Sequence, residues 1–243
     1  MKVIILAGGL GSRLSEHTKT IPKPMVKIAG HPIIKLIMKH YLKYNFNDFY
    51  IASGYKGYII KKYFKNFKKS GIAFNYKVFK KKCKITIIDT GLKTFTGGRL
   101  KRLKPFIKKN ESFMFTYGDG LSDINIKKLV KFHQKNKKIV TVTAVRPAAR
   151  FGEIIMKNNL VKSFKEKPQT DQSWINGGFF VSDYKIFDFI RNDKEILEKK
   201  PLEELSKKKQ LVAYKYYGFW KCMDTLRDKN VLDRIYKKKL KNK

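Results

Sequence analysis

The sequence has few cysteines and no long apolar run. Its 243 residues include two cysteines, Cys83 and Cys222, so we expect no disulfide framework, and no Cys/His cluster has zinc spacing. No stretch approaches the ~18 consecutive apolar residues of a membrane-spanning helix, so we expect no membrane association. The chain enters an apolar strand at once, with no charged leader or cleavage site, which favours a reducing, cytoplasmic setting.

Acidic residues are also scarce, at 19 against 56 lysines and arginines, and the formal net charge is +37. Such a charge suggests nucleic acid as a partner. The excess, however, is 48 lysines and only 8 arginines, spread along the chain, whereas nucleic-acid sites usually draw on arginine. We therefore expect a solvated lysine surface and no nucleic-acid partner, with a polyanion-binding protein as an alternative. In either case the positive field attracts anionic substrates.

Apolar strands alternate with amphipathic helices over the first 150 residues. We predict strands at 1–6, 48–53, 73–79, 84–89, 112–117 and 139–145, and helices at 32–44, 58–67 and 126–136, with another opening at Thr96. This alternation predicts an α/β fold, a Rossmann-like, doubly wound and mostly parallel sheet. After Phe151, shorter hairpin-like strands at 153–156, 160–164 and 178–181 predict a small β-rich lobe. A basic helix from Leu226 to Lys241 follows.

Glycines follow the first strand in the run Gly8-Gly9-Leu10-Gly11-Ser12-Arg13. Glycine lacks a Cβ, so the backbone can turn sharply and approach a ligand, and its exposed N–H groups form an anion-binding concavity. Arg13 and Lys23 add cations beside it. The spacing matches neither the Rossmann fingerprint nor the P-loop. A nucleoside triphosphate fits the arrangement, and a tight structural turn is the alternative.

Two aspartates are candidate Mg²⁺ ligands. Asp119 lies between two glycines at the end of a strand, where its carboxylate is accessible, and Mg²⁺ prefers one or two carboxylates together with phosphate oxygens. A turn aspartate bonded to its own backbone is an equal alternative. The partner is Asp224, which could also be the N-cap of the helix that begins near Leu226.

Two further segments lie beside predicted strand ends. Glu166-Lys167-Pro168 follows a strand, although most exposed charged pairs have no special role. In Asn176-Gly177-Gly178 the glycines let backbone approach a hydroxylated ligand next to an amide, and a hairpin turn explains them equally well.

Taken together and in order, these segments resemble the sugar-1-phosphate nucleotidyltransferase family through most of the chain. The resemblance is closer to members that use CTP and glucose 1-phosphate than to uridylyl or thymidylyl members. The discriminating segments are Thr96–Arg102 and Gly218–Asp228. The others are the glycine run, Pro22-Lys23-Pro24, Gly54–Lys56, Asp89–Gly91, Tyr117–Gly120, Phe151-Gly152, Glu166–Pro168 and Ile175–Phe180.

The resemblance implies a role for each matching residue. It implies catalysis by Arg13, Lys23 and Asp119, and Mg²⁺ binding by Asp119 and Asp224. The implied nucleotide-binding residues are Leu6, Gly8, Gly9, Gly11, Ser12, Arg13, Lys23, Arg99 and Gly118. The implied sugar-phosphate-binding residues are Glu166, Lys167, Asn176 and Gly177. The chain departs from the family pattern at Ser12, where threonine is commoner, and over 79–89, which is shorter.

The resemblance also implies a reaction. An oxygen of glucose 1-phosphate attacks the α-phosphorus of CTP, giving CDP-glucose and pyrophosphate for cell-surface polysaccharide synthesis of the O-antigen type. UTP, dTTP or another sugar phosphate is an alternative, and an inactive nucleotide-binding regulator is another. We expect one domain over 1–243, with a nucleotide-binding part at about 1–150 and a sugar-binding lobe and terminal helix at about 151–243. We also expect a homo-oligomer.

Overall fold

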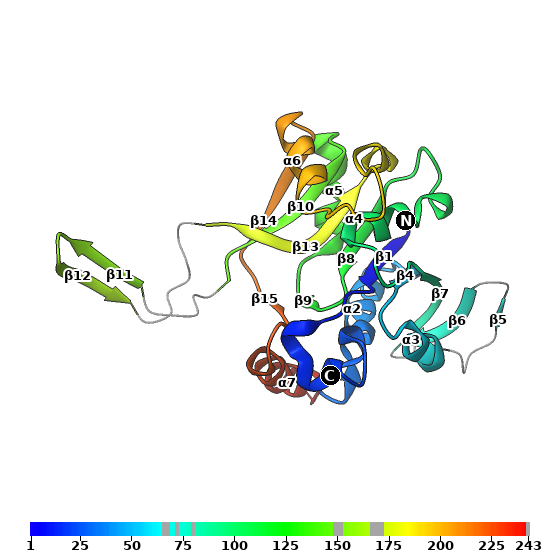
Figure 1. The fold of residues 1–243 in the computed structure, drawn as a ribbon, viewed down its shortest axis with the longest axis horizontal. Coiled ribbons are helices and arrows are strands. Elements are labelled where there is room, and N and C mark those ends of the chain that lie inside the picture. Colours follow the sequence, from blue (N-terminus) through cyan, green and yellow to red (C-terminus); the bar gives the residue numbers. More distant parts are fainter. Residues whose placement is uncertain (65–68, 71–72, 79–80, 148–152, 166–172, 242–243) are drawn as a thin grey trace.

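The computed structural model describes residues 1–64, 69–70, 73–78, 81–147, 153–165 and 173–241. Its centre is a nine-stranded sheet (Figure 1). Seven strands run in one direction, and β13 and β6 are reversed within the sheet. In order across the sheet, the strands are β14 (Leu211–Tyr216), β10 (Val140–Val145), β13 (Ile175–Ser182), β8 (Phe113–Tyr117), β1 (Val3–Ala7), β4 (Asp48–Ser53), β7 (Lys81–Asp89), β6 (Ala73–Val78) and β5 (Lys69–Ser70).

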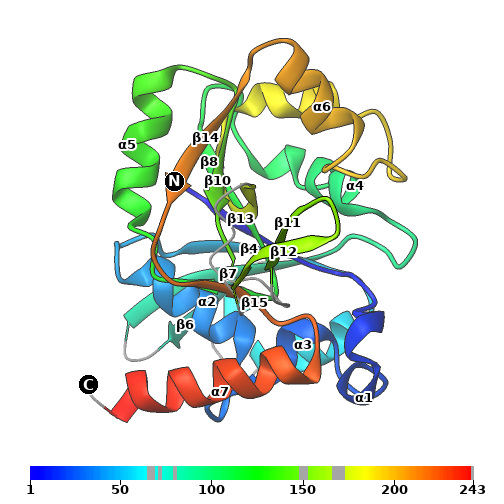
Figure 2. The same ribbon diagram turned by 90° about the vertical axis from the view of Figure 1, so that its left-hand side faces the viewer.

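The predicted α/β class is confirmed, and the apolar pattern explains it. All five residues of β1 are buried, because helices cover both faces of the sheet. Ile5 points into the core that contains α2, α3, α5 and α7, whereas Ile4 points into the core that contains α4 and α6. Figure 2 shows α4 and α6 above the sheet and α2, α3 and α7 below it.

The predicted helices are present with small changes at their ends. The long ones are α2 (Ile33–Leu42), α5 (Ile126–Asn136) and α7 (Leu226–Lys241). The helix predicted over 58–67 is α3 (Gly57–Phe64), and its predicted last residues lie outside the described part of the chain. The short helices are α1 (Ser15–Thr18), α4 (Thr96–Lys101) and α6 (Lys200–Lys207). Over the described residues, no helix combines the length and apolarity that a membrane crossing requires.

The predicted β-rich lobe is a single hairpin. β11 (Glu153–Lys157) pairs antiparallel with β12 (Leu160–Lys165), and the hairpin projects from the body (Figure 1). The third strand assigned to the lobe, at 178–181, instead belongs to β13, which lies between β8 and β10 in the main sheet. That prediction was wrong because both faces of this strand are buried, which places it in the core and not in an exposed hairpin.

A small two-stranded sheet joins the middle of the chain to its end. β9 (Gly120–Ser122) pairs antiparallel with β15 (Trp220–Cys222). The two strands place Asp119, which precedes β9, next to Met223, whose N–H donates to the Asp119 carbonyl at 2.9 Å. This pairing brings Asp119, from the middle of the chain, and Asp224, near its end, to one site.

Candidate active site

A cleft of about 620 Å³ lies beyond the carboxyl ends of β1 and β8. Open α/β sheets bind ligands at this edge, because neighbouring parallel strands end there together. All the residues predicted to bind the nucleotide line the cleft, namely Leu6, Gly8, Gly9, Gly11, Ser12, Arg13, Lys23, Arg99 and Gly118. Asp119, Asp224 and Asn176 also line it, whereas Gly177, the next residue after Asn176, does not. Glu166 and Lys167 lie outside the described residues.

The glycine run adopts the sharp turn that its composition predicts. Gly11 has a φ of 67°, in the left-handed region that favours glycine. Gly8 lies against the buried side chain of Arg99, and a Cβ on Gly8 would be 2.1 Å from Arg99 Nη1. A methyl group at position 8 would therefore have to displace the Arg99 guanidinium.

Arg99 lines the cleft and bonds to the segment that follows β7. Its Nη1 donates to Thr90 Oγ1 at 2.7 Å and to the Gly91 carbonyl at 2.8 Å, and burial lowers its pKa from the usual value. These bonds tie the segment after β7 to α4 beneath the glycine run. Arg99 Nη2 also donates to the Leu92 carbonyl, at 3.4 Å, so both terminal nitrogens bond to the protein. The contact of Arg99 with the nucleotide stays a prediction.

We expect Gly8→Ala to lower the free energy of unfolding by about 1–3 kcal/mol, the usual cost of forcing a methyl group into a packed site. Gly9→Ala is the matched control, since a Cβ there meets no atom within 4 Å and Gly9 is not among the glycines with positive φ. We expect the control to change stability by less than about 0.5 kcal/mol. Urea denaturation measures both, and equal losses would contradict this account of the loop.

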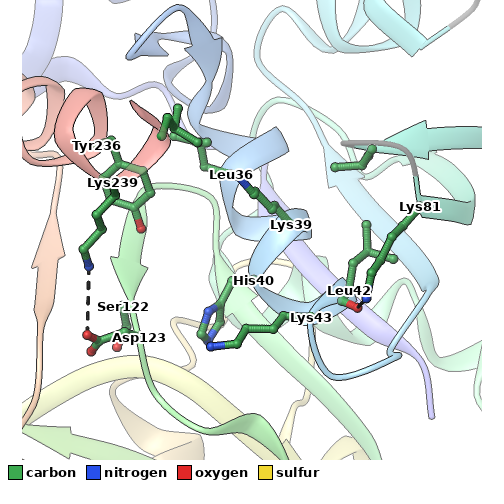
Figure 3. Close-up of a pocket in the computed structure, with 12 residues that line it drawn as sticks. Leu36, Lys39, His40, Leu42, Lys43, Lys81, Ser122, Asp123, Tyr236 and Lys239 are labelled. Atoms are coloured by element: carbon green, nitrogen blue, oxygen red, sulfur yellow. Dashed lines mark hydrogen bonds and ion pairs between the residues drawn. The ribbon is translucent and has the colours of Figure 1, made fainter. Parts of the chain in front are cut away.

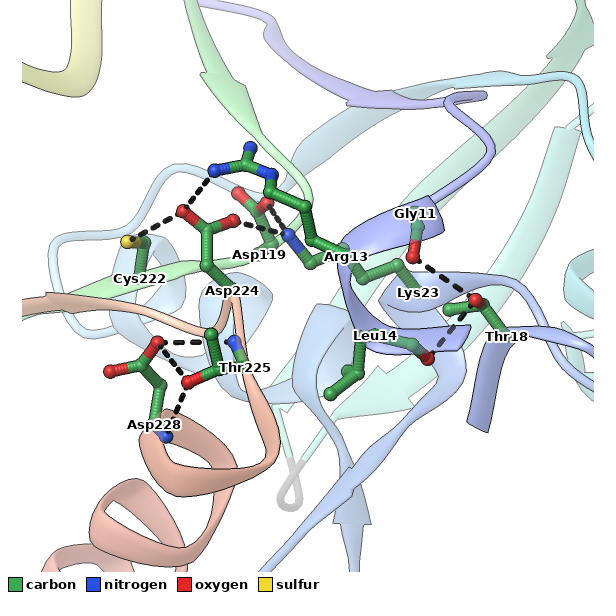
Figure 4. Close-up of polar contacts among 10 residues, drawn as sticks. All are labelled: Gly11, Arg13, Leu14, Thr18, Lys23, Asp119, Cys222, Asp224, Thr225 and Asp228. Atoms are coloured by element: carbon green, nitrogen blue, oxygen red, sulfur yellow. Dashed lines mark hydrogen bonds and ion pairs between the residues drawn. The ribbon is translucent and has the colours of Figure 1, made fainter. Parts of the chain in front are cut away.

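Four charged side chains meet at the other side of the cleft (Figure 4). The Lys23 ammonium donates to Asp119 Oδ2 at 2.6 Å and to Asp224 Oδ1 at 2.8 Å. Arg13 Nη1 donates to the second oxygen of Asp224, also at 2.8 Å. Lys23 is the most buried of the four, with 11% of its side chain exposed, and Arg13 is mostly exposed. Asp119 and Asp224, more than a hundred residues apart in sequence, thus face one cation.

The pKa values of this cluster follow from its ion pairs. Burial alone would lower the pKa of Lys23, but the charges and hydrogen bonds of Asp119 and Asp224 outweigh it and raise that pKa. Burial alone would raise the pKa of Asp224, but Lys23 and Arg13 lower it. The lysine and this carboxylate are therefore both charged at neutral pH.

The alternative role of Asp224 as a helix cap is wrong. Thr225 caps α7: its Oγ1 accepts from the Asp228 N–H at 3.2 Å, and Asp228 Oδ2 accepts from the Thr225 N–H at 3.1 Å (Figure 4). This reciprocal pair is a capping box, which satisfies the first N–H groups of the helix. The carboxylate of Asp224 is left to face the cleft.

Asn176, at the start of β13, lines the cleft and is fixed by two hydrogen bonds. Its Nδ2 donates to Tyr117 Oη at 3.0 Å, and its Oδ1 accepts from the Gly178 N–H at 2.8 Å. The Gly177 carbonyl accepts from Trp220 Nε1 at 2.7 Å, so the region between β15 and β13 is tied together. The amide of Asn176 has one N–H left to donate to a ligand.

Some cleft residues had no role in the sequence interpretation. Thr96, Tyr117 and Trp220 were inside the quoted motifs but were given no function, and Glu198 belonged to no motif. Cys222 also lines the cleft, and its thiol, whose pKa burial raises to about 12, donates to Asp224 at 3.6 Å. No local pattern singles out Glu198, because its position depends on the packing of the segment before α6.

A second cavity, of about 380 Å³, lies between α2, α7 and β9 (Figure 3). Four lysines and apolar side chains line it, and its lining includes one carboxylate, Asp123, which pairs with Lys239 at 3.9 Å. It lacks both a glycine turn and paired acids, so it does not match the predicted site.

A family model for nucleotidyl transferases matches residues 2–221. The chain belongs to this nucleotidyl transferase family. The glucose-1-phosphate cytidylyltransferase of Salmonella typhimurium is 46% identical to it, over 98% of this chain and 96% of the relative. The D-glycero-α-D-manno-heptose 1-phosphate guanylyltransferase of Aneurinibacillus thermoaerophilus is 31% identical, over 90% of this chain and 89% of the relative.

Solved structures share the fold of this nucleotidyl transferase. A UDP-glucose pyrophosphorylase complexed with UDP-glucose superimposes with a TM-score of 0.72 at 20% identity, covering 98% of each chain. The inositol-1-phosphate CTP transferase of T. maritima superimposes with a TM-score of 0.68 at 16% identity, covering 97% of this chain and 95% of the other. At identities of 20% and 16%, these two comparisons show a common fold only.

Proposed function

We propose that this nucleotidyl transferase joins CTP and glucose 1-phosphate to give CDP-glucose and pyrophosphate, supplying cell-surface polysaccharide synthesis. One observation carries the proposal: Arg13, Lys23, Asp119 and Asp224 converge beside a glycine turn at the end of a sheet. The likeness to a glucose-1-phosphate cytidylyltransferase over nearly the whole chain supports this choice of base and sugar.

The chemistry follows from the charges. A phosphate oxygen of glucose 1-phosphate forms a bond to the α-phosphorus of CTP, the bond from that phosphorus to the β-phosphate oxygen breaks, and pyrophosphate leaves with the electron pair. The attacking phosphate is already a competent nucleophile, so no general base is required. The barrier is mainly one of bringing two polyanions together. Lys23, Arg13 and the amides of the glycine turn lower it by holding the phosphates, and Asn176, Gly177, Glu166 and Lys167 position the sugar phosphate.

The cluster also fits a bound Mg²⁺ ion. Asp119 and Asp224 direct carboxylate oxygens at one cationic group, the ammonium of Lys23, and oxygen donors of this kind suit Mg²⁺. Among the described residues, no three His, Cys, Asp or Glu side chains lie together so that they could hold a metal ion. Phosphate oxygens and water would therefore complete the coordination. Bound Mg²⁺ would neutralise charge on the transferred phosphoryl group.

The proposal is tested by assaying pyrophosphate release with each of CTP, UTP, dTTP and GTP against glucose 1-phosphate and other hexose 1-phosphates. We expect the highest kcat/KM with CTP and glucose 1-phosphate, and loss of activity in EDTA that Mg²⁺ restores. Activity with UTP or dTTP but not with CTP would favour the related nucleotidyltransferase instead. An absence of turnover with every pair would contradict the enzymatic proposal.

We also propose that the β11–β12 hairpin joins copies of this chain in a homo-oligomer. A two-stranded hairpin alone is only marginally stable in water, and exposed edges and apolar faces favour association with another chain. At least half of the surface is exposed on six large apolar side chains of this hairpin: Ile154, Ile155, Met156, Leu160, Val161 and Phe164.

We expect light scattering on the purified protein to give a mass that is a multiple of 28.5 kDa. The paired change Met156→Glu with Leu160→Glu should shift the protein toward the monomer, because charge on an apolar interface opposes association. Lys157→Glu, on the same hairpin, is the control and should leave the mass unchanged. A wild-type protein that is monomeric at micromolar concentration would contradict the oligomer.

A further inference from the structure

Glu198 is an acid in the cleft that the proposed reaction does not use. Of the residues that the structure describes, three carboxylates line the cleft, and two of them, Asp119 and Asp224, hold Lys23. No lysine or arginine of the described residues forms an ion pair with Glu198. In a chain with a net charge of +37, a carboxylate that faces a ligand cleft without a cation is unusual.

Two hydroxyl groups hold Glu198 in place. Thr96, at the start of α4, donates from Oγ1 to Oε2 at 2.6 Å, and Tyr117, at the end of β8, donates from its phenol to Oε1 at 2.5 Å. Burial and the charge of Glu198 raise the pKa of Tyr117, so the phenol stays protonated and keeps donating. A carboxylate has about four acceptor positions, so the two bonds leave Glu198 able to accept from a ligand.

Glu198 and the cluster of Arg13, Lys23, Asp119 and Asp224 are anchored on opposite faces of the sheet. Leu197, the residue before it, packs in the core that holds α4, whereas Met25 and Met223, next to the Lys23 cluster, pack in the core on the other face of the sheet. A carboxylate repels a triphosphate, so Glu198 faces an uncharged part of the substrates. Thr96, which holds Glu198, lies on α4 together with Arg99, and Arg99 lies against Gly8.

We infer that Glu198 reads the exocyclic amino group of the cytosine base and so selects CTP over UTP. This inference rests on the proposed function. Cytosine presents the N4 amino group, a donor, at the position where uracil presents the O4 oxygen, an acceptor, and Glu and Asp are suited to accept from that amino group. A carboxylate fixed by Thr96 and Tyr117 accepts from cytosine and repels uracil, so it both attracts the correct base and rejects the wrong one.

Two substitutions test the inference. Glu198→Gln keeps the size and the acceptor oxygen but removes the charge and adds an amide that can donate to O4 of uracil. We expect the ratio of kcat/KM for CTP to that for UTP to fall at least tenfold. Glu198→Asp keeps the charge but withdraws it by one methylene, so kcat/KM for CTP should fall while discrimination against UTP persists. Glu203→Gln, an exposed glutamate on α6, is the matched control and should leave the ratio within twofold of the wild type.

The outcomes separate this inference from the proposed function. A wild-type enzyme that prefers CTP and whose ratio survives Glu198→Gln contradicts the inference alone. If Glu198→Gln raises the KM for glucose 1-phosphate and leaves the CTP-to-UTP ratio of kcat/KM unchanged, Glu198 contacts the hexose and the inference is also overturned. A wild-type enzyme that prefers UTP overturns the proposed function itself. Thermal shifts with CTP and with UTP, measured without turnover, verify that each variant is folded and give the binding preference independently.

Discussion

Asparagine in place of Asp119 or of Asp224 is expected to lower turnover by roughly 10²–10³, the usual loss when one preorganised electrostatic group is removed from an active site. The amide has nearly the same size as the carboxylate but no charge. Each variant therefore removes one of the two negative groups that face Lys23, at 2.6 and 2.8 Å. If both acids hold Mg²⁺, each variant also raises the Mg²⁺ concentration needed for half-maximal activity.

Steady-state pyrophosphate release over a Mg²⁺ titration measures both effects. Asp193→Asn is the control, because it removes an exposed ion pair with Arg102 that is outside the cleft. This variant should keep the wild-type rate and the wild-type Mg²⁺ dependence. A folded Asp119→Asn or Asp224→Asn protein with near-normal turnover would remove that residue from the proposed site.

Lys23→Met should have a comparable effect on turnover, roughly 10²–10³, because it removes the cation proposed to hold the α-phosphate. Stability should change as well. Without Lys23, two carboxylates in a partly buried site are left facing one another. We expect the free energy of unfolding at neutral pH to fall by roughly 1–3 kcal/mol, less than for a fully buried pair because water reaches Asp119.

The pH dependence of this stability loss has a definite sign. In the wild type, Lys23 lowers the pKa of Asp224, so the pair stabilises the protein above the ordinary Asp value of 3.8, and this contribution is lost as the pH falls through the lower folded value. The pKa of Lys23 is raised, so its contribution persists through neutral pH and is lost only above the ordinary lysine value of 10.5. The difference between wild type and Lys23→Met should therefore be largest at neutral pH and should shrink below the ordinary Asp value of 3.8, as the ion pair of Lys23 with Asp224 is lost.

Urea denaturation at several pH values measures that difference. Lys27→Met is the control, since Lys27 is an exposed lysine of β2 (Lys27–Ile28) and does not line the cleft. It should leave both turnover and the pH profile unchanged. A Lys23→Met protein whose stability deficit is the same at every pH would contradict the charge repulsion, and normal turnover would contradict the catalytic role.

Local patterns predicted much of the fold because they report burial directly. The apolar run of β1 and the 3.6-residue spacing of α2 need no knowledge of distant segments. The sharp turn at Gly8 and Gly11 was also predicted, because it involves only neighbouring residues. The same reasoning misassigned 178–181, since a short apolar strand is equally compatible with a hairpin and with the centre of a sheet. The sequence around Asn176 and Gly177 does not indicate that β13 lies between β8 and β10.

From the residues alone came the α/β class, the glycine turn and the two aspartates as candidate Mg²⁺ ligands, because the strands, the helices and each of these motifs are written in short stretches of the chain. The tertiary structure alone decided that Asp119 and Asp224 share the ammonium of Lys23 and that Glu198 faces the cleft. These contacts join residues far apart along the chain. Their formation depends on the β9–β15 pairing and on how the segment before α6 packs, and both are properties of the assembled core that no short pattern encodes.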